Sequence, residues 1–489
     1  MASDYSVNRL PVLVSKPDSL EWRSSDMKKI TGDLIAFITG SRYENLPEEV
    51  VKEAKRTLLD SIGCALGGIA TEKGKIAVAL AKRLGGREES SLIGLGDRVS
   101  CANAAFANGE LVNSLDYDAI SHIPPFVIPP VLAIAESTRA SGKDLILSTA
   151  LGHEISKRLI LALSNMVAKL SKEAKTPDVF GNSNECIFGA TTGVARILNL
   201  SPEQLAHALG IAAYQCSLPV CRDWEDTVPK SMIKYVPVGW LCQGAITATL
   251  LAEKGYTANP RVFDGEYGFW RFYGAERWDP DLVVNNLGEQ WRFLEMAYKP
   301  YPCCRFFHGQ LDCFIRIIEK NHLLPEVIES VQVFGLPFVA NPAPLEVTNQ
   351  TDVQFSLPFV FSCAAHRIKI GGDWQDWDTI RNPRIREFMK KVTMLVDPKA
   401  MEAKRNDPRS WFSRVEVVAK GKNYVEETTY ARWTNFTDVK ATDEELVDKF
   451  RSNAGRILTQ NKIEDAVNCI LELERVEDIA ELMNLTTLR

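Results

Sequence analysis

One short segment of the chain, SLDYDAISHIPPFVIPP at residues 114–130, combines two carboxylates with a histidine. Asp116 and Asp118 precede His122, one of only six histidines among 489 residues. Histidine is the residue type that most often moves protons in enzymes at neutral pH. A carboxylate can orient such an imidazole or act as a base itself, so the segment could carry out general acid–base chemistry. The alternative is a helix cap at Asp116 followed by an ordinary loop histidine.

Prolines follow His122 closely and bear on how the segment is held. Because proline cannot donate a backbone hydrogen bond, we expect these residues to interrupt the helix and to stiffen the connection. Asp116 and Asp118 would face the same way only in an extended segment, since on a helix they diverge by about 200°. A stiff loop would fix the imidazole in space. The prolines are Pro124, Pro125, Pro129 and Pro130.

Two lysines lie in apolar or aromatic surroundings, where an ammonium group needs a partner. Lys234 belongs to TVPKSMIKYVPVGW at 227–240, four residues after Lys230, and Lys299 lies between tyrosines and prolines in YKPYP. Each side chain could extend its charge to solvent or bind an anion. In the second case, both would suit the carboxylates of an acidic substrate.

The segment YKPYPCCRFFHGQLDC at 298–313 adds further reactive groups. Arg305 and His308 follow the adjacent Cys303 and Cys304, and His308 is predicted near the start of a helix. A cysteine–histidine nucleophile pair is conceivable. Adjacent buried cysteines are more often packing residues, so a hydrolase that uses either thiol is the weakest of the alternatives.

A fourth segment, FGNSNECIFG at 180–189, places Ser183 and Asn184 just before a predicted helix. Backbone N–H groups at a helix start, together with these two side chains, could bind an anion. The local sequence alone does not distinguish such a site from a simple turn.

The composition limits the classes of function. Hydrophobic residues make up 45% and charged residues 25%, which is typical of a globular protein, and the formal net charge is −6 without a basic block. Nucleic-acid or membrane partners are therefore not expected. The eleven cysteines form no CxxC pair, and with so few histidines no cluster of ligands has the spacing of a zinc site. Without a signal-peptide pattern or an apolar run of roughly 18 residues, a cytoplasmic location is expected.

The elements that must position these groups fall into two kinds of pattern. After a polar arm at 1–26, helical periodicity with good start and stop signals dominates 27–289. Alternating patterns such as VIESVQVFGLP and RVEVVAKGKNYVEETTYARW then predict strands, with helices such as PRIREFMKKVTML between them, so 290–435 is predicted to be an α+β domain. Residues 436–489 are helical again and are expected to pack on the first part. The predicted fold is mainly α with an inserted α+β domain.

Several segments occur in an order that resembles the MmgE/PrpD family over about residues 28–485. They are YENLPEEVVKEAKRTLLDSIGCALGG, LDYD…H…IPPVLAIAE, SMIKYVPVGW, YGFWRFYG, YKPYPCCRFFHGQLD and VQFSLPF. That family includes 2-methylcitrate dehydratase, cis-aconitate decarboxylase and iminodisuccinate epimerase. The resemblance implies a large helical domain built from both chain ends, an inserted α+β lid, a homodimer and no cofactor.

The resemblance also implies site residues. The acidic loop position of the family matches Asp116, its loop histidine matches His122, and the lysine of its MxK block matches Lys234. Its lid lysine and lid histidine match Lys299 and His308. In relatives these residues face one cleft between the domains. Arg305, Ser183 and Asn184 are added here as candidate substrate-binding residues.

The chain departs from the family pattern at several positions. Dehydratase-like and decarboxylase-like members carry a longer acidic loop with a further acid, a threonine and another histidine, where this chain has Ala119, Ile120 and Ser121. Ser183 and Pro237 stand where those members have histidines. The lysines survive better than the proton-transfer groups, so the acidic substrate class is better supported than the reaction.

The resulting prediction is a cofactor-independent lyase, a dehydratase or decarboxylase, that acts on a small di- or tricarboxylate. Proton transfer next to a carboxylate would involve His122 or His308, with Asp116 as orienting group or base, and the lysines would stabilise the enolate-like charge. The alternatives are an epimerase or isomerase of a dicarboxylate such as iminodisuccinate, and a catalytically inactive ligand-binding or scaffold homologue.

Overall fold

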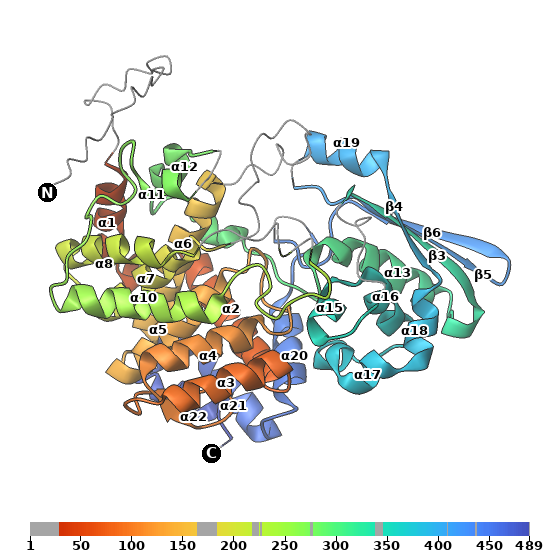
Figure 1. The fold of residues 1–489 in the computed structure, drawn as a ribbon, viewed down its shortest axis with the longest axis horizontal. Coiled ribbons are helices and arrows are strands. Elements are labelled where there is room, and N and C mark those ends of the chain that lie inside the picture. The colour runs from red at the N-terminus through yellow and green to blue at the C-terminus, as the bar shows by residue number, and fades with distance from the viewer. Residues whose placement is uncertain are drawn as a thin grey trace, which may run out of the picture.

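The computed structural model describes residues 29–163, 183–217, 224, 227–273, 277–337, 346–407, 409–435 and 438–488. The polar arm expected at 1–26 lies outside these residues. The described residues form two packed units, a larger helical unit and a smaller α+β unit (Figure 1).

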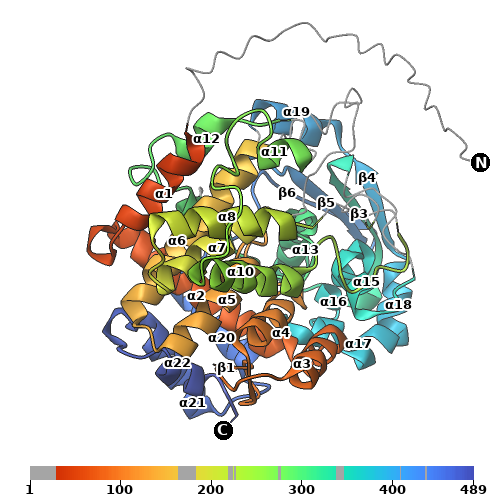
Figure 2. The same ribbon diagram turned by 60° about the vertical axis from the view of Figure 1, so that its left-hand side comes forward.

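The helical unit is built from both ends of the chain. Its hydrophobic core runs from Ile30 to Tyr298 and resumes from Trp433 to Met483. In Figures 1 and 2, the blue C-terminal helices lie against the red and orange N-terminal ones, and α20 packs directly on α2. The N-terminal helices are α1 (Ile30–Gly40), α2 (Glu48–Gly68), α3 (Glu72–Leu84), α4 (Cys101–Asn113), α5 (Pro124–Thr138), α6 (Gly142–Leu163), α7 (Cys186–Ile197), α8 (Pro202–Gln215), α10 (Val238–Glu253), α11 (Phe269–Phe272) and α12 (Pro280–Val284), and the C-terminal ones are α20 (Asp443–Ala454), α21 (Gln460–Leu471) and α22 (Ala480–Leu485).

Local sequence signals explain several helix boundaries. Ser201 caps α8 in a capping box with Gln204, and Thr442 caps α20 in the same way with Glu445. Two short strands, β1 (Ser90–Ser91) and β2 (Arg98–Val99), form an antiparallel pair within the otherwise helical first part.

The expected proline-stiffened loop is wrong, because all four prolines belong to α5. Pro124 and Pro125 occupy its first turn, where the missing N–H groups would have no helical partner anyway. Pro129 and Pro130 lie inside the helix and leave the carbonyls of Pro125 and Phe126 without their usual donors. The thiol of Cys242 lies 3.2 and 3.6 Å from these two oxygens and partly replaces the lost bonds.

The α+β unit has its own core between Tyr301 and Ala419. Its sheet has the order β4-β3-β5-β6, with β3 and β4 parallel and the other pairs antiparallel. Lys420 and Gly421, at φ 53° and 69°, form the tight turn of the β5–β6 hairpin. The strands are β3 (Ile328–Gly335), β4 (Val392–Val396), β5 (Ser413–Ala419) and β6 (Lys422–Thr428), and the helices are α13 (His308–Lys320), α15 (Gln350–Phe355), α16 (Leu357–Ala365), α17 (Trp377–Arg381), α18 (Pro383–Met389) and α19 (Pro398–Asn406).

The strands β3, β5 and β6 confirm the alternating patterns, whereas β4 was not predicted. The segment PRIREFMKKVTML was expected to be helical throughout, but α18 ends at Met389. Val392–Val396 instead pairs in parallel with β3, with Val392 opposite Val331. A run rich in β-branched residues next to an open strand edge favours sheet pairing over helix continuation.

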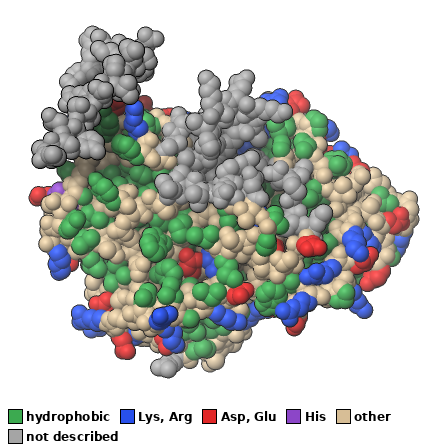
Figure 3. All heavy atoms as spheres, viewed as in Figure 1, with side chains coloured by type: hydrophobic (Ala, Val, Ile, Leu, Met, Phe, Trp, Pro, Cys, Tyr) green, Lys and Arg blue, Asp and Glu red, His purple; other side chains and the backbone are tan. Residues whose placement is uncertain are grey.

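One face of the molecule carries charged side chains of both signs. In Figure 3, basic and acidic side chains are interspersed on the face shown, and hydrophobic side chains gather over the helical unit. Among the described helices, none combines the length and apolar character that a bilayer crossing requires.

Candidate active site

The predicted acidic segment forms the loop between α4 and α5, and it is fastened to the segment that carries Lys299. The N–H of Ile120 donates to the carbonyl of Ala297 at 2.7 Å. The hydroxyl of Tyr117 donates to the carbonyl of Pro300 at 3.2 Å. Residues distant in sequence are therefore held side by side, with Asp116 facing Lys299.

The carboxylate of Asp116 is shared by two ammonium groups. Lys299 Nζ lies 2.7 Å from Oδ2 and Lys234 Nζ contacts Oδ1, while all three side chains are only 1% exposed. Lys299 also donates to the backbone carbonyl of Asp116 at 2.9 Å, and Lys234 donates to the carbonyl of Asn113 at 3.3 Å. The structure thus brings three predicted site residues together at one buried point.

The electrostatic environment differs between the two lysines. Burial opposes ionisation of Asp116, but Lys234 and Lys299 outweigh it and hold the pKa of this carboxyl well below its usual range. Burial lowers the pKa of Lys234 more than Asp116 and Asp118 raise it. For Lys299 the two carboxylates outweigh burial and raise the pKa. Lys299 therefore holds its proton more strongly than Lys234 does.

His122 lies beside this cluster and is oriented by Asp118. Its Nδ1 is 2.7 Å from Asp118 Oδ2, and its Nε2 is 3.9 Å from Asp116 Oδ1. The Tyr235 ring lies 5.2 Å from the imidazole, centre to centre. Burial raises the pKa of Asp118, but His122 and the lysines more than compensate and lower it. The His122 side chain is 18% exposed, which makes it the group in this cluster that solvent reaches best.

Backbone strain is concentrated here. Five of the twelve non-glycine residues with positive φ in the described chain lie around this cluster. The left-handed conformation costs a residue with a side chain roughly 1–2 kcal/mol. Such strain persists only where the surrounding structure enforces it, which is common at functional sites. The residues are Asp116 (54°), Ser121 (71°), His122 (49°), Ser183 (55°) and Lys234 (58°).

His308 occupies a different environment at the start of α13. Its Nε2 donates to the carbonyl of Cys303 at 3.1 Å, so Nδ1 is the nitrogen that accepts from Arg305, at 3.3 Å. Burial, Arg305 and Lys299 lower its pKa well below the usual range. His308 is thus a buried neutral imidazole with both nitrogens bonded to the protein.

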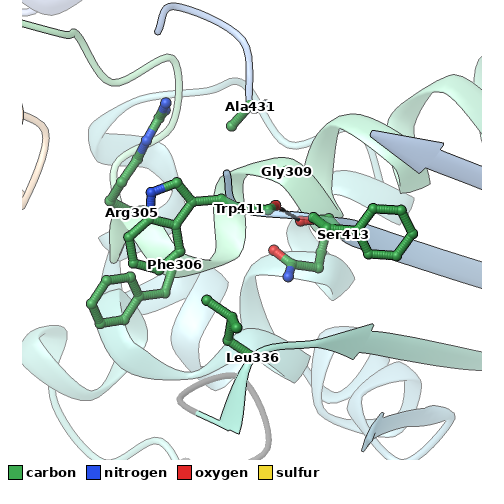
Figure 4. A pocket seen from close by; sticks show the side chains of 9 residues that line it. Arg305, Phe306, Gly309, Leu336, Trp411, Ser413 and Ala431 are labelled. Carbon is green, nitrogen blue, oxygen red and sulfur yellow. Dashed lines mark hydrogen bonds between the residues drawn. The ribbon is translucent and has the colours of Figure 1, made fainter. Parts of the chain in front are cut away.

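Arg305 forms part of the wall of a pocket in the α+β unit (Figure 4). Its guanidinium donates to the carbonyl of Arg432 at 3.1 Å and to the hydroxyl of Thr434 at 2.5 Å. Burial lowers its pKa to about 10. The pocket is also lined by Phe306, which stacks on Trp411 with ring centres 4.9 Å apart. In the described chain, Arg305 makes no hydrogen bond to Asp116, Lys234 or Lys299.

Ser183 and Asn184 point to different neighbours. The Ser183 hydroxyl donates to the carbonyl of Ser121 at 3.1 Å, next to His122. The amide of Asn184 donates to the carbonyl and hydroxyl oxygens of Ser217, at 2.8 and 2.9 Å. Ser183 therefore supports the acidic loop, whereas Asn184 binds Ser217, two residues beyond the end of α8.

A thiol nucleophile finds no support at Cys303. The side chain is fully buried, and burial raises the pKa of its thiol well above the usual value. A nucleophilic cysteine needs the opposite shift. His308 contacts the backbone carbonyl of Cys303, and it cannot activate the thiol through that bond.

Asp116, Asp118 and His122 place possible metal-ligating atoms within 4.8 Å of one another. However, each oxygen of Asp116 already contacts an ammonium group. A divalent cation bound there would lie against two positive charges. The arrangement suits an anionic guest better than a cation.

The sequence-based set of site residues omitted Asp118. The resemblance carried only one acid over, and periodicity placed the two acids on different faces of a helix. The loop conformation instead turns Asp116 toward the lysines and Asp118 toward His122. The four-residue spacing from Asp118 to His122 was the available signal.

Comparisons with known proteins identify the family of this chain. The model of the MmgE/PrpD N-terminal domain matches residues 32–280, and that of the MmgE/PrpD C-terminal domain matches residues 301–473. The cis-aconitate decarboxylase of Homo sapiens is 26% identical over 484 residues, covering 94% of this chain and 95% of the relative. A cis-aconitate decarboxylase of Aspergillus terreus is 22% identical over 496 residues, covering 93% and 95%.

Proposed function

Because the chain belongs to the MmgE/PrpD family, we propose that it is a lyase that decarboxylates a small unsaturated tricarboxylate of the cis-aconitate type. The observation that carries the proposal is the convergence of Lys234, Lys299 and His122 on one buried carboxylate. Dehydration of a related hydroxy acid is the neighbouring lyase reaction. The full-length similarity to cis-aconitate decarboxylases favours decarboxylation.

The lysines supply the binding charge for substrate carboxylates. An ammonium group has three N–H donors. Lys299 donates one hydrogen bond to the side chain of Asp116 and one to its carbonyl. Lys234 donates one to the side chain of Asp116 and one to the carbonyl of Asn113. In the described chain, each lysine therefore keeps one N–H that can meet a substrate oxygen. Asp116 holds the two ammonium groups together, which otherwise would repel each other.

The proposed reaction needs one proton and no external oxidant or reductant. The bond between a methylene carbon and its carboxylate breaks and releases CO₂. Its electron pair forms a new double bond to the central carbon. The former double-bond pair moves to the carbon next to another carboxylate, where the enolate-like charge develops. Lys234 and Lys299 stabilise this charge, and a proton then neutralises the carbon. Preorganised donors at such a charge contribute several kcal/mol.

His122 is the proposed proton donor. Its Nε2 faces the Asp116–lysine cluster, and Asp118 fixes the ring through Nδ1. A carboxylate in this position holds the imidazole in one orientation and stabilises its charged form while the proton is delivered. We assign Asp116 to organising the lysines, and His308 to structural support of Arg305 and the Cys303 turn. This assignment revises the earlier expectation that either histidine could move the proton.

Deuterium labelling tests the proposal directly. Purified protein is incubated in D₂O with cis-aconitate, 2-methylcitrate or iminodisuccinate, and CO₂ release and product spectra are followed. The expected result is CO₂ release from cis-aconitate with one deuterium on the product carbon next to a carboxylate. Binding of all three acids without turnover would favour the inactive, scaffold-like alternative and overturn the proposal.

A second candidate, epimerisation of a dicarboxylate, is favoured by the altered proton-transfer groups. Ser183 stands where the dehydratase-like and decarboxylase-like members of the family have a histidine, and its hydroxyl is bonded to the Ser121 carbonyl. One imidazole beside a lysine of lowered pKa could remove and return a proton on opposite faces of a carbon. Deuterium exchange at the stereocentre of iminodisuccinate, without CO₂ loss, would establish this alternative.

We retain a homodimer as a further proposal, because the resemblance implies it. An exposed apolar stripe on α3 is available for such a contact, with Ile76, Leu80 and Leu84 at four-residue spacing and 40–55% exposed. Light scattering of the purified protein should give twice the mass of 54.6 kDa.

A further inference from the structure

A third buried lysine, Lys449, connects the C-terminal helix α20 to the candidate active site. Its side chain is 3% exposed. The Nζ atom lies 2.6 Å from Asp60 Oδ1, donates to the carbonyl of Tyr117 at 2.7 Å and donates to the carbonyl of Lys299 at 3.1 Å. It also lies 3.8 Å from the centre of the Tyr117 ring. One ammonium group thus has three oxygen partners, which come from three distant segments.

Two of these partners belong to the segments that hold the reacting groups. Tyr117 lies between Asp116 and Asp118, so its carbonyl fixes the turn that sends the two carboxylates in different directions. The carbonyl of Lys299 belongs to the residue whose ammonium binds Asp116. The Tyr117 hydroxyl bonds the next residue, Pro300. The backbone carbonyl and the side-chain hydroxyl of Tyr117 therefore both help to set the distance between the acidic loop and Lys299.

Asp60 holds the ammonium of Lys449 within hydrogen-bond distance of the carbonyls of Tyr117 and Lys299. It comes from α2, is 2% exposed, and has its pKa raised by burial in spite of the opposing effect of Lys449. A buried ion pair of this kind is weak as a source of stability, since apolar residues of similar size often do as well. Its contacts suggest a geometric role instead.

We propose that Lys449, held by Asp60, is a positioning residue that sets the alignment of Asp116 with Lys299. The inference rests on the proposed function, in which that alignment binds the substrate and stabilises the developing charge. Lys449 itself does not touch the substrate in this proposal. Loss of its ammonium would let the two backbone segments separate and would lower kcat.

The experiment separates positioning from folding with paired variants. Lys449→Met leaves Asp60 buried without its counter-ion, and it is expected to lower Tm strongly. The double variant Asp60→Asn/Lys449→Met removes both charges and should recover most of the lost Tm. Its kcat is nevertheless expected to stay at least about tenfold below wild type, because neither new side chain can bind both carbonyls.

Arg451 on the same helix provides the matched control. It is 42% exposed and pairs with Glu464 on the surface. Arg451→Ala should keep kcat within about twofold of wild type, because exposed ion pairs contribute little. A double variant with wild-type kcat would overturn the positioning role, as would an equal loss of kcat in Arg451→Ala.

Crystal structures keep the test independent of the proposed substrate. If the wild-type protein turns over none of the candidate acids, the proposed function fails, and positioning is judged from coordinates alone. The 2.7 Å contact between Lys299 Nζ and Asp116 Oδ2 should lengthen beyond hydrogen-bond range in the double variant. An unchanged contact would overturn the inference.

Discussion

Two of the buried charge clusters in the helical unit are organised differently. In one, Arg158 pairs with Glu154 on α6, and both side chains are 1% exposed. In the other, Asp116 pairs with Lys234 and Lys299 at the same exposure. Burial and charge alone therefore do not distinguish a structural cluster from a candidate active site.

The Arg158 cluster is saturated by its own protein. Besides Glu154, the guanidinium donates to five backbone carbonyls between residues 282 and 290, at 2.7–3.4 Å. The second oxygen of Glu154 accepts the N–H of Phe293 at 2.8 Å. The Arg158–Glu154 pair thus fastens the segment that follows α12 to α6. The guanidinium has no N–H donor left for a ligand.

The Asp116 cluster has unused donors and a strained backbone. Each lysine keeps one N–H after its contacts within the described chain, and Asp116 and Lys234 both adopt positive φ. Neither glutamate nor arginine of the first cluster does so, since both belong to the regular helix α6. Spare hydrogen-bonding capacity at a strained position is thus the better indicator of function.

The largest contrast should come from removing one cation of each cluster. Arg158→Met leaves Glu154 buried without a counter-ion, and it leaves five backbone carbonyls without their hydrogen-bond donor. The free energy of unfolding should therefore fall by about 3–5 kcal/mol. Lys299→Met leaves Asp116 paired with Lys234. Its kcat/KM should fall by about 10²–10³-fold with little change in stability. Chemical denaturation and steady-state kinetics measure the two effects.

Activity corrected for the folded fraction is the control for this pair. Arg158→Met should retain near-normal kcat per folded molecule at low temperature. The distinction between the clusters would be lost if Lys299→Met unfolded the protein as Arg158→Met does, or if it kept full activity.

The same criterion separates the two candidate histidines. His122 has Nδ1 on Asp118 and Nε2 facing the cluster, whereas both nitrogens of His308 are bonded to the protein. His122→Gln should lower kcat by about 10²–10⁴-fold, the usual contribution of a general acid. His308→Gln keeps a hydrogen-bonding side chain and should lower kcat less than about tenfold, mainly with a loss of stability. Comparable losses in both variants would return His308 to the catalytic set.

Much of the architecture was predictable from local patterns, because helices with clear start and stop signals and alternating strands depend on short-range sequence. The strand β4 was missed, since its pairing with β3 is a tertiary effect. The prolines of α5 were misjudged, because the thiol of Cys242, more than a hundred residues away, partly satisfies the carbonyls that they leave free.

For the site, residue types and family resemblance identified Asp116, His122, Lys234 and Lys299, and the structure brings them together. The partnership of Asp118 with His122 depends on a loop with positive φ at Asp116, Ser121 and His122. No periodicity encodes such a loop. The contact of Lys449 with two carbonyls depends on how α20 packs, which local sequence does not reveal either.

A smaller effect should separate the clusters by pH. The pKa of Asp118 lies below its unfolded value near 3.8, so the stability it contributes is present above about pH 4 and is lost as pH falls through the folded pKa. Burial raises the pKa of Glu154, so its ionised form opposes folding as pH rises. Asp118→Asn should flatten the acid limb of the unfolding free energy by up to about 1.4 kcal/mol per pH unit. Urea titrations between pH 2.5 and 5 measure this slope. Glu154→Gln is the opposite control and should leave the acid limb at least as steep as in the wild type. An unchanged slope in Asp118→Asn would mean that His122 and the lysines do not stabilise the Asp118 carboxylate.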